Sequence, residues 1–284
     1  MGIKKVGVVG FSGVMGSGIA QLCASCGYEV IGCSRNADKN AQALERIGGF
    51  LGRAVEKGKL SEQDKMAALA RIEMTTDMDL FAGCDIVIES VAENIDLKRD
   101  VFAALDRVCA PDTILASNTS SLSIIDMAMC TRRPNKVLGF HFFNPAPVMN
   151  LLEVVKTIAT DEATLEAGKE FGRKLGKNVV VARDAPGYIV NSLLIPYLLN
   201  AIRMLDRGQA SREDIDIAVK LGLNNPMGPL ALSDFIGLDT LLFVADVIYE
   251  DSKDAQYAAP SLLKKMVTAG WLGKKSGKGF YEYK

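Results

Sequence analysis

The feature that most constrains the fold of this chain is a glycine-rich turn close to its N-terminus. The apolar segment Val6–Val9 leads directly into Gly10-Phe-Ser-Gly13-Val-Met-Gly16, and a helical pattern follows. A strand that passes through such a turn into a helix directs backbone N–H groups and the positive end of the helix at a phosphate group. The residues that we expect around a pyrophosphate are Gly10, Ser12, Gly13, Val14, Met15 and Gly16.

The glycine spacing is one residue longer than the common dinucleotide-binding pattern. An ordinary glycine-rich turn between a strand and a helix is therefore the alternative interpretation. A second predicted strand, which begins at Glu29, favours nucleotide binding because it completes the start of a strand–helix–strand unit.

Short β-branched runs alternate with helical patterns as far as Val181, and after Asp184-Ala-Pro-Gly187 only helical patterns continue. Continuous apolar strands between helices are typical of a parallel sheet covered on both faces. We predict an α/β, Rossmann-like, mostly parallel doubly wound sheet in a dinucleotide-binding domain (residues 1–185), followed by an all-α domain for substrate binding and dimerisation (residues 186–284). The predicted strands are Val6–Val9, Glu29–Ile31, Asp85–Glu89, Thr113–Ala116, Lys136–Leu138, Leu152–Val155 and Asn178–Val181, and the predicted helices include Ala37–Lys57, Ser61–Arg71, Tyr188–Leu205, Glu213–Leu221, Gly237–Tyr249 and Pro260–Ala269.

Composition narrows the class of protein further. The 33 basic and 34 acidic side chains nearly cancel, which argues against a nucleic-acid partner. The N-terminus lacks the apolar core of a signal peptide, and polar residues interrupt the longest apolar stretch, residues 186–205, so we expect no membrane span.

Six scattered cysteines suit reduced thiols, and we predict a cytoplasmic protein. Cys23 and Cys26 have redox spacing but fall in a helical pattern, and a single histidine predicts no metal site.

The end of the second predicted strand bears on which dinucleotide binds. An NAD site places a carboxylate here, about 20 residues beyond the glycines, to accept from the ribose 2′-hydroxyl. Ser34 and Arg35 occupy this position instead, and a hydroxyl with a guanidinium suits a 2′-phosphate. We therefore favour NADP(H) over NAD(H). Asp38 is a nearby acid that could serve an NAD ribose, and Arg35 as a solvated loop charge is the alternative.

His141 is the only histidine, so any imidazole acid–base chemistry must use it. It follows the predicted strand Lys136–Leu138, and doubly wound folds bind their ligands at the carboxyl ends of strands. Glu153 lies twelve residues later in an apolar run, where an acid needs a partner or solvent. Pairing with Glu153 would fix the imidazole tautomer and stabilise the imidazolium form. Without further motifs, a lone histidine on an apolar strand is more often a core residue.

Further motifs run in order along nearly the whole chain: Met15-Gly-Ser-Gly-Ile-Ala-Gln21, Ala116-Ser-Asn-Thr-Ser-Ser-Leu122, His141-Phe-Phe-Asn-Pro145, Ala185-Pro-Gly-Tyr-Ile-Val-Asn191, Asn225-Pro-Met-Gly-Pro-Leu-Ala-Leu-Ser-Asp-Phe-Ile-Gly-Leu-Asp239 and Gly277-Lys-Gly-Phe-Tyr281. With this set the chain resembles the 3-hydroxyacyl-CoA dehydrogenase family, and within it the bacterial 3-hydroxybutyryl-CoA dehydrogenases. The resemblance implies hydride transfer between (S)-3-hydroxybutyryl-CoA and acetoacetyl-CoA, with a nicotinamide cofactor and an acyl-CoA as partners.

The resemblance also implies roles for individual residues. His141 would be the catalytic acid–base and Glu153 its partner, Ser120 would bind the reacting oxygen, and Asn191 would hold the substrate near its carbonyl. Arg53 and Lys57 would meet the phosphates of CoA. The residues implied beside the cofactor are Glu93, Lys98, Asn118, Ser120, Asn144 and Lys275.

The chain departs from the family pattern at the longer glycine turn and at Ser34-Arg35, which puts the usual NAD(H) in doubt but not the reaction. Arg53 stands where lysine is usual, and Ser192 where many relatives carry a basic residue. One alternative is a dehydrogenase of a small CoA-free hydroxy acid or sugar acid, which has no use for a distant phosphate site. Another is a non-catalytic nucleotide-binding protein, which would be expected to have lost the His–Glu pair.

Overall fold

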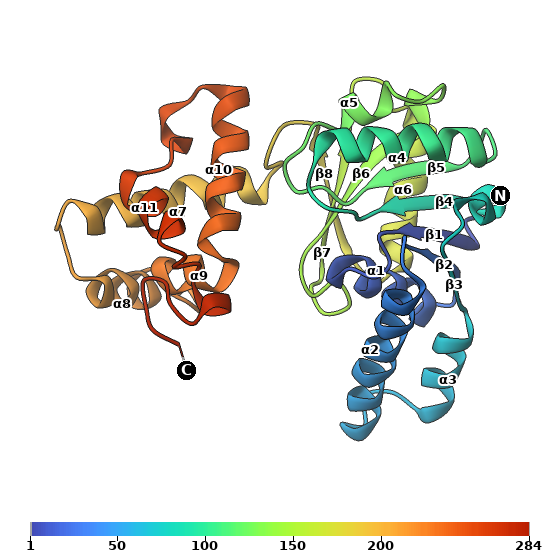
Figure 1. Cartoon of the computed structure of the whole chain (residues 1–284), viewed down its shortest axis with the longest axis horizontal. Coiled ribbons are helices and arrows are strands. Elements are labelled where there is room, and N and C mark those ends of the chain that lie inside the picture. The colour runs from blue at the N-terminus through green and yellow to red at the C-terminus, as the bar shows by residue number, and fades with distance from the viewer. Residues whose placement is uncertain (1, 284) are drawn as a thin grey trace. The chain divides into compact units, whose positions relative to one another are not determined.

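The computed structural model describes residues 2–283 and divides the chain into two compact units, Met1–Asp184 and Ala185–Lys284 (Figure 1). In its described part, the first unit contains an eight-stranded sheet in the order β3-β2-β1-β4-β5-β6-β7-β8. The strands are β1 Lys5–Val9, β2 Glu29–Cys33, β3 Ile72–Thr75, β4 Ile86–Glu89, β5 Ile114–Ser117, β6 Val137–Phe142, β7 Leu151–Lys156 and β8 Asn178–Arg183. The predicted mostly parallel sheet is therefore confirmed.

The pairing of β6 with β7 is antiparallel, and the other neighbouring strands run parallel to each other. Only eight residues, 143–150, connect β6 to β7. A parallel crossover needs a dozen or more residues, so the chain must turn back here. This reversal places the end of β6 opposite the beginning of β7.

The sheet includes one strand, β3, that the sequence patterns did not predict. β3 lies at the edge of the sheet and pairs with β2. Glu73 and Met74 are exposed, so this strand lacks the continuous apolar run that marks the buried strands. The seven predicted strands are all present, with ends that differ by a few residues.

Helices cover both faces of the sheet, as a doubly wound fold requires (Figure 1). Side chains of β4 alternate: Ile86 and Ile88 belong to the apolar core that also contains Ile19 of α1 and Phe171 of α6. Val87 therefore points to the opposite face. The helices of this unit are α1 Val14–Ser25, α2 Ala37–Glu56, α3 Glu62–Ala70, α4 Ile95–Val108, α5 Ile124–Ala128 and α6 Glu162–Lys174.

Local sequence signals account for where several helices begin. Asn36 caps α2 by accepting a hydrogen bond from the backbone N–H of Lys39, and Ser61 caps α3 by accepting from that of Asp64. Cys23 is buried within α1 and Cys26 is its C-cap. Burial raises the pKa of the Cys23 thiol well above its usual range, as expected for an unreactive core cysteine.

The second unit is helical and has its own apolar core, which includes Leu198, Leu241 and Leu263. Asp234 fastens the chain end to this core, because its carboxylate accepts hydrogen bonds from the backbone N–H groups of Phe280 and Tyr281. Within residues 2–283, no helix is long and apolar enough to cross a membrane. The helices are α7 Val190–Asp206, α8 Arg212–Gly222, α9 Pro229–Ile236, α10 Leu238–Ser252 and α11 Ser261–Thr268.

Candidate active site

The glycine turn between β1 and α1 forms a close-fitting cradle of backbone. Gly10 has φ +84°, a conformation that favours glycine, and a Cβ there would lie 2.4 Å from the carbonyl oxygen of Ser90. A Cβ on Gly16 would lie 2.3 Å from the carbonyl oxygen of Gly10. The first turn of α1 contains no acidic residue, so its positive end is not neutralised. The cradle therefore fits the phosphates of a dinucleotide.

A cavity of about 400 Å³ opens beside this turn. Arg35 and Lys39 line it, but Asp38 does not. The Ser34 hydroxyl donates its only proton to Oδ1 of Asn40 at 2.6 Å, so in this arrangement it does not donate to a 2′-phosphate, as the sequence had suggested. The other lining residues are Val9, Gly10, Ser12, Gly13, Cys33, Ser34, Asn36, Thr76, Met78, Ser90, Val91, Ala92, Leu97 and Val101. The cavity therefore combines the glycine turn with apolar walls and two cationic side chains. This combination suits the adenosine half of a dinucleotide.

His141 and Glu153 face each other across the antiparallel pair β6–β7. They are register partners, and Nδ1 of His141 lies 2.5 Å from Oε2 of Glu153. Because a carboxylate can only accept, the geometry assigns the proton of this contact to Nδ1 of His141. Glu153 is fully buried and His141 is 6% exposed. The sequence-predicted pair is thus brought into direct contact.

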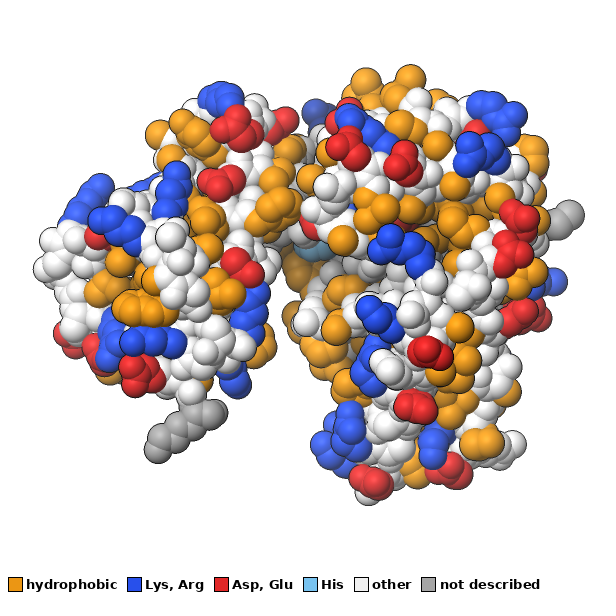
Figure 2. All heavy atoms as spheres, viewed as in Figure 1, with side chains coloured by type: hydrophobic (Ala, Val, Ile, Leu, Met, Phe, Trp, Pro, Cys, Tyr) orange, Lys and Arg blue, Asp and Glu red, His pale blue; other side chains and the backbone are white. Residues whose placement is uncertain are grey.

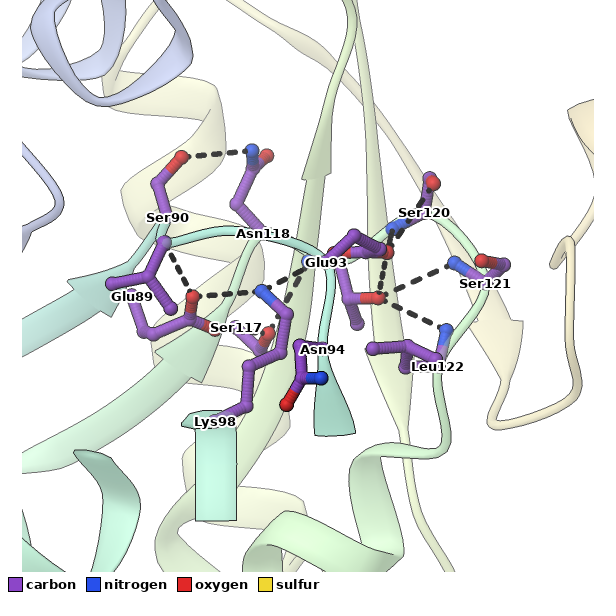
Figure 3. Close-up of polar contacts among 12 residues, drawn as sticks. Glu89, Ser90, Glu93, Asn94, Lys98, Ser117, Asn118, Ser120, Ser121 and Leu122 are labelled. Atoms are coloured by element: carbon purple, nitrogen blue, oxygen red, sulfur yellow. Dashed lines mark hydrogen bonds and ion pairs between the residues drawn. The ribbon is translucent and has the colours of Figure 1, made fainter. Parts of the chain in front are cut away.

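Glu93 and Ser120 meet where the loops after β4 and β5 come together. Oε1 of Glu93 accepts from the backbone N–H of Ser120 at 3.0 Å and from the Ser120 hydroxyl at 3.4 Å. The hydroxyl of Thr119 donates to the same oxygen. Lys98, expected beside the cofactor, is 1% exposed and pairs with Glu89 at 2.7 Å and with Glu93 at 3.2 Å (Figure 3). The carboxylates therefore hold the Lys98 ammonium inside the protein.

Two further contacts position the segment that carries His141. Oδ1 of Asn118 accepts from the backbone N–H of Phe142, next to the histidine, at 3.0 Å. Lys177 donates to the carbonyl oxygens of Ala146 and Met149 at 2.7 and 2.8 Å, within the loop that follows Asn144. Burial lowers the pKa of Lys177 from its usual value. The exposed Asn144 therefore lies at the start of a loop that is fastened at two points.

Basic side chains follow the length of α2 in the first unit (Figure 2). Lys39, Arg46 and Arg53 recur every seven residues, about two helical turns, so they share one face. Lys57 follows at the C-cap, and all four are exposed. Arg46 donates to the carbonyl oxygen of Ser12 in the glycine turn at 2.8 Å. We name Lys39, Arg46, Arg53 and Lys57 the basic stripe; it extends from the cavity to the far end of α2.

Two expected site residues, Asn191 and Lys275, belong to the second unit. Asn191 lies in the first turn of α7 and is half-buried. Lys275 is exposed and forms a 2.6 Å ion pair with Asp239. The Lys275 ammonium is therefore already neutralised within its own unit.

The sequence patterns did not single out Glu89, Asn36, Lys39 or Lys177. The sequence does contain a signal for Glu89, because this acid ends an apolar strand. Glu153, which was singled out, is likewise an acid within an apolar run. Lys39 could have been found from its seven-residue spacing to Arg46. Nothing local marks Lys177, whose partners lie about 30 positions earlier in the chain.

A Rossmann-type sheet with a phosphate cradle and a buried histidine–carboxylate pair defines a dinucleotide-dependent oxidoreductase. Comparison with known proteins makes this class specific. Residues 5–185 match the model of the 3-hydroxyacyl-CoA dehydrogenase NAD binding domain, and residues 187–283 that of the family's C-terminal domain. The chain belongs to the 3-hydroxyacyl-CoA dehydrogenase family.

Individual relatives agree with this assignment. A 3-hydroxybutyryl-CoA dehydrogenase of Mycobacterium tuberculosis is 49% identical over 288 residues, which covers 99% of each chain. The crystal structure of M. tuberculosis FadB2 matches with a TM-score of 0.97 and 49% identity over 100% of both chains. That of the (S)-3-hydroxybutyryl-CoA dehydrogenase PaaH1 from Ralstonia eutropha matches with a TM-score of 0.97 and 42% identity over 99% of both.

Proposed function

We propose that this enzyme interconverts (S)-3-hydroxybutyryl-CoA and acetoacetyl-CoA by hydride transfer with a nicotinamide dinucleotide. The observation that carries the proposal is the contact between His141 and Glu153, on the same sheet that forms the phosphate cradle. The names of the relatives support the four-carbon thioester as substrate. When bound, the nicotinamide would accept or deliver the hydride.

His141 manages the proton that accompanies the hydride. In the oxidation direction, Nε2 takes the proton from the C3 hydroxyl, and in the reduction direction the imidazolium returns it to the oxygen. Glu153 stabilises the imidazolium and keeps the ring oriented through Nδ1. General acid–base assistance of this kind contributes a factor of ~10²–10⁴ to the rate.

Other residues would position the substrate. The Ser120 hydroxyl would exchange its long, 3.4 Å contact with Glu93 for a hydrogen bond to the reacting oxygen, and Asn191 would hold the thioester carbonyl. Arg53 and Lys57 would bind the phosphates of CoA, since both are exposed cations at the C-terminal end of α2. A small CoA-free hydroxy acid would leave this end of the basic stripe without a ligand.

The test is an absorbance assay of cofactor oxidation with acetoacetyl-CoA, compared with free acetoacetate at the same concentration. We expect turnover of the thioester and a kcat/KM for the free acid that is lower by about 10² or more, because the acid forgoes the binding energy of the CoA phosphates. Absence of turnover with either substrate would remove the proposed function. Equal kcat/KM values would favour the CoA-free alternative.

We further propose that the enzyme prefers NADP(H). Arg35 and Lys39 line the cavity and its lining includes no carboxylate, which suits a 2′-phosphate. We expect Arg35→Gln to raise the KM for NADPH about tenfold, the magnitude of one charge-assisted hydrogen bond, and to change that for NADH less than twofold. Arg99→Gln, an exposed arginine on α4, is the matched control. Equal losses with both cofactors in Arg35→Gln would contradict the preference.

We also propose a homodimer that forms through the second unit. Three large apolar side chains of this unit, Leu221, Leu223 and Phe235, are 80%, 65% and 63% exposed, and contact with a second copy would remove them from water. We expect light scattering to give twice the 30.6 kDa chain mass, and Leu221→Asp to shift the protein toward monomer. A wild-type monomer at micromolar concentration would refute the proposal.

A further inference from the structure

Glu89 is a fully buried carboxylate that the proposed reaction does not use directly. It ends β4, and its Oε1 accepts from the Val91 backbone N–H at 2.6 Å and from the Lys98 ammonium at 2.7 Å. Its Oε2 accepts from the Ser117 hydroxyl at 2.7 Å (Figure 3). Burying a charge is costly unless it is paired, and here each carboxylate oxygen has a donor. The contacts join the end of β4, the loop after it, β5 and α4.

The Lys98 ammonium also connects Glu89 to the residues proposed to bind the substrate. Lys98 also pairs with Oε2 of Glu93 at 3.2 Å, and Oε1 of Glu93 holds the backbone N–H and hydroxyl of Ser120. Glu93 retains 28% side-chain exposure, so it is the least fixed of the three charged groups. Without its contacts to Lys98 and to the loop after β5, the Glu93 side chain could rotate toward solvent.

Glu89 also reaches Ser120 by a second route. The Ser117 hydroxyl, which donates to Glu89, accepts from the backbone N–H of Thr119 at 3.2 Å. Glu89 and Ser117 are register partners on neighbouring strands, so the rigid sheet sets their separation. Both routes converge on the loop Asn118–Ser120, which carries the group assigned to the reacting oxygen.

We propose that Glu89 is a positioning residue for the reaction: it holds Lys98 against Glu93 and Ser117 against Thr119, and thereby fixes the backbone that carries the Ser120 side chain. This inference rests on the proposed function of Ser120. A misplaced donor costs transition-state stabilisation even when the fold survives. Glu89→Gln keeps the shape and removes the charge that holds Lys98, so kcat should fall about tenfold with little change in the KM for the cofactor.

A double-mutant cycle separates positioning from general destabilisation. Ser120→Ala should lower kcat by about 10² because it removes the donor itself. If Glu89 acts through Ser120, then adding Glu89→Gln to Ser120→Ala lowers kcat by less than twofold more. Fully multiplicative effects, or an unchanged kcat in Glu89→Gln alone, would overturn the proposal. Wild-type enzyme without turnover would instead overturn the proposed function.

Two further variants complete the experiment. Asp106→Asn is the matched control, since Asp106 also lies on α4's buried side and pairs with Arg133 at 2.8 Å; it should lower the melting temperature but leave kcat within twofold. Ser117→Ala is the milder test if Glu89→Gln does not fold. It should lower kcat severalfold, and this loss too should vanish in the Ser120→Ala background; a loss that persists there refutes the proposal.

Discussion

Replacing His141 with alanine should lower kcat by ~10²–10⁴ while the Kd of the dinucleotide changes less than threefold. The reason is that, in the proposed mechanism, His141 supplies proton transfer, whereas the phosphate cradle and the cavity beside it would bind the cofactor. The measurement pairs steady-state rates with acetoacetyl-CoA with a fluorescence titration of the reduced cofactor.

The control for lost packing is His141→Asn. Asparagine can still donate a hydrogen bond to Glu153, but its amide cannot exchange a proton near neutral pH. It should therefore lose as much activity as the alanine variant. A His141→Ala enzyme that kept its kcat, or an asparagine variant that recovered it, would show that another group transfers the proton.

Replacing Glu153 with glutamine should also lower kcat by about 10² or more. An amide at this position can hydrogen-bond the ring, but it cannot offset the positive charge that the imidazole gains during the reaction. Its NH₂ group would also favour the wrong tautomer, with Nδ1 as acceptor. Steady-state kinetics and thermal unfolding measured on the same samples separate activity from stability.

The two variants should be strongly non-additive, because the proposed mechanism has His141 and Glu153, which are in direct contact, act as one unit. The kcat of the double variant, His141→Ala with Glu153→Gln, should lie within a factor of about two of the kcat of His141→Ala alone. Multiplicative losses would mean that Glu153 has a separate role. A Glu153→Gln enzyme with full activity and a lower melting temperature would reduce Glu153 to a structural residue.

The parts of the fold that could be predicted are those with a local chemical cause. The glycine turn was predicted because close backbone approach leaves no room for a side chain at Gly10 or Gly16. The buried strands were predicted because their burial on both faces makes them continuously apolar. β3 could not be predicted this way, since an exposed edge strand carries polar residues such as Glu73.

The site divides in the same manner. An acid within an apolar run and a single imidazole suggested a pairing of His141 with Glu153, and the family resemblance implied it; the structure places the two in contact. The position of Lys98 did not follow, because its two carboxylate partners approach from the end of β4 and from the loop after it. Such a cluster depends on how α4 packs on the sheet, and the spacing of residues along the chain does not indicate that packing.

The antiparallel pairing of β6 with β7 ties the alignment of the catalytic pair to the main-chain ladder. β7 is bonded on both sides, to β6 and to β8, so it cannot slide by one residue without breaking two ladders at once. Such a slip would turn Glu153 to the other side of the sheet. The proton-transfer machinery therefore withstands local loosening of surface loops, and its geometry lasts as long as the central sheet remains folded.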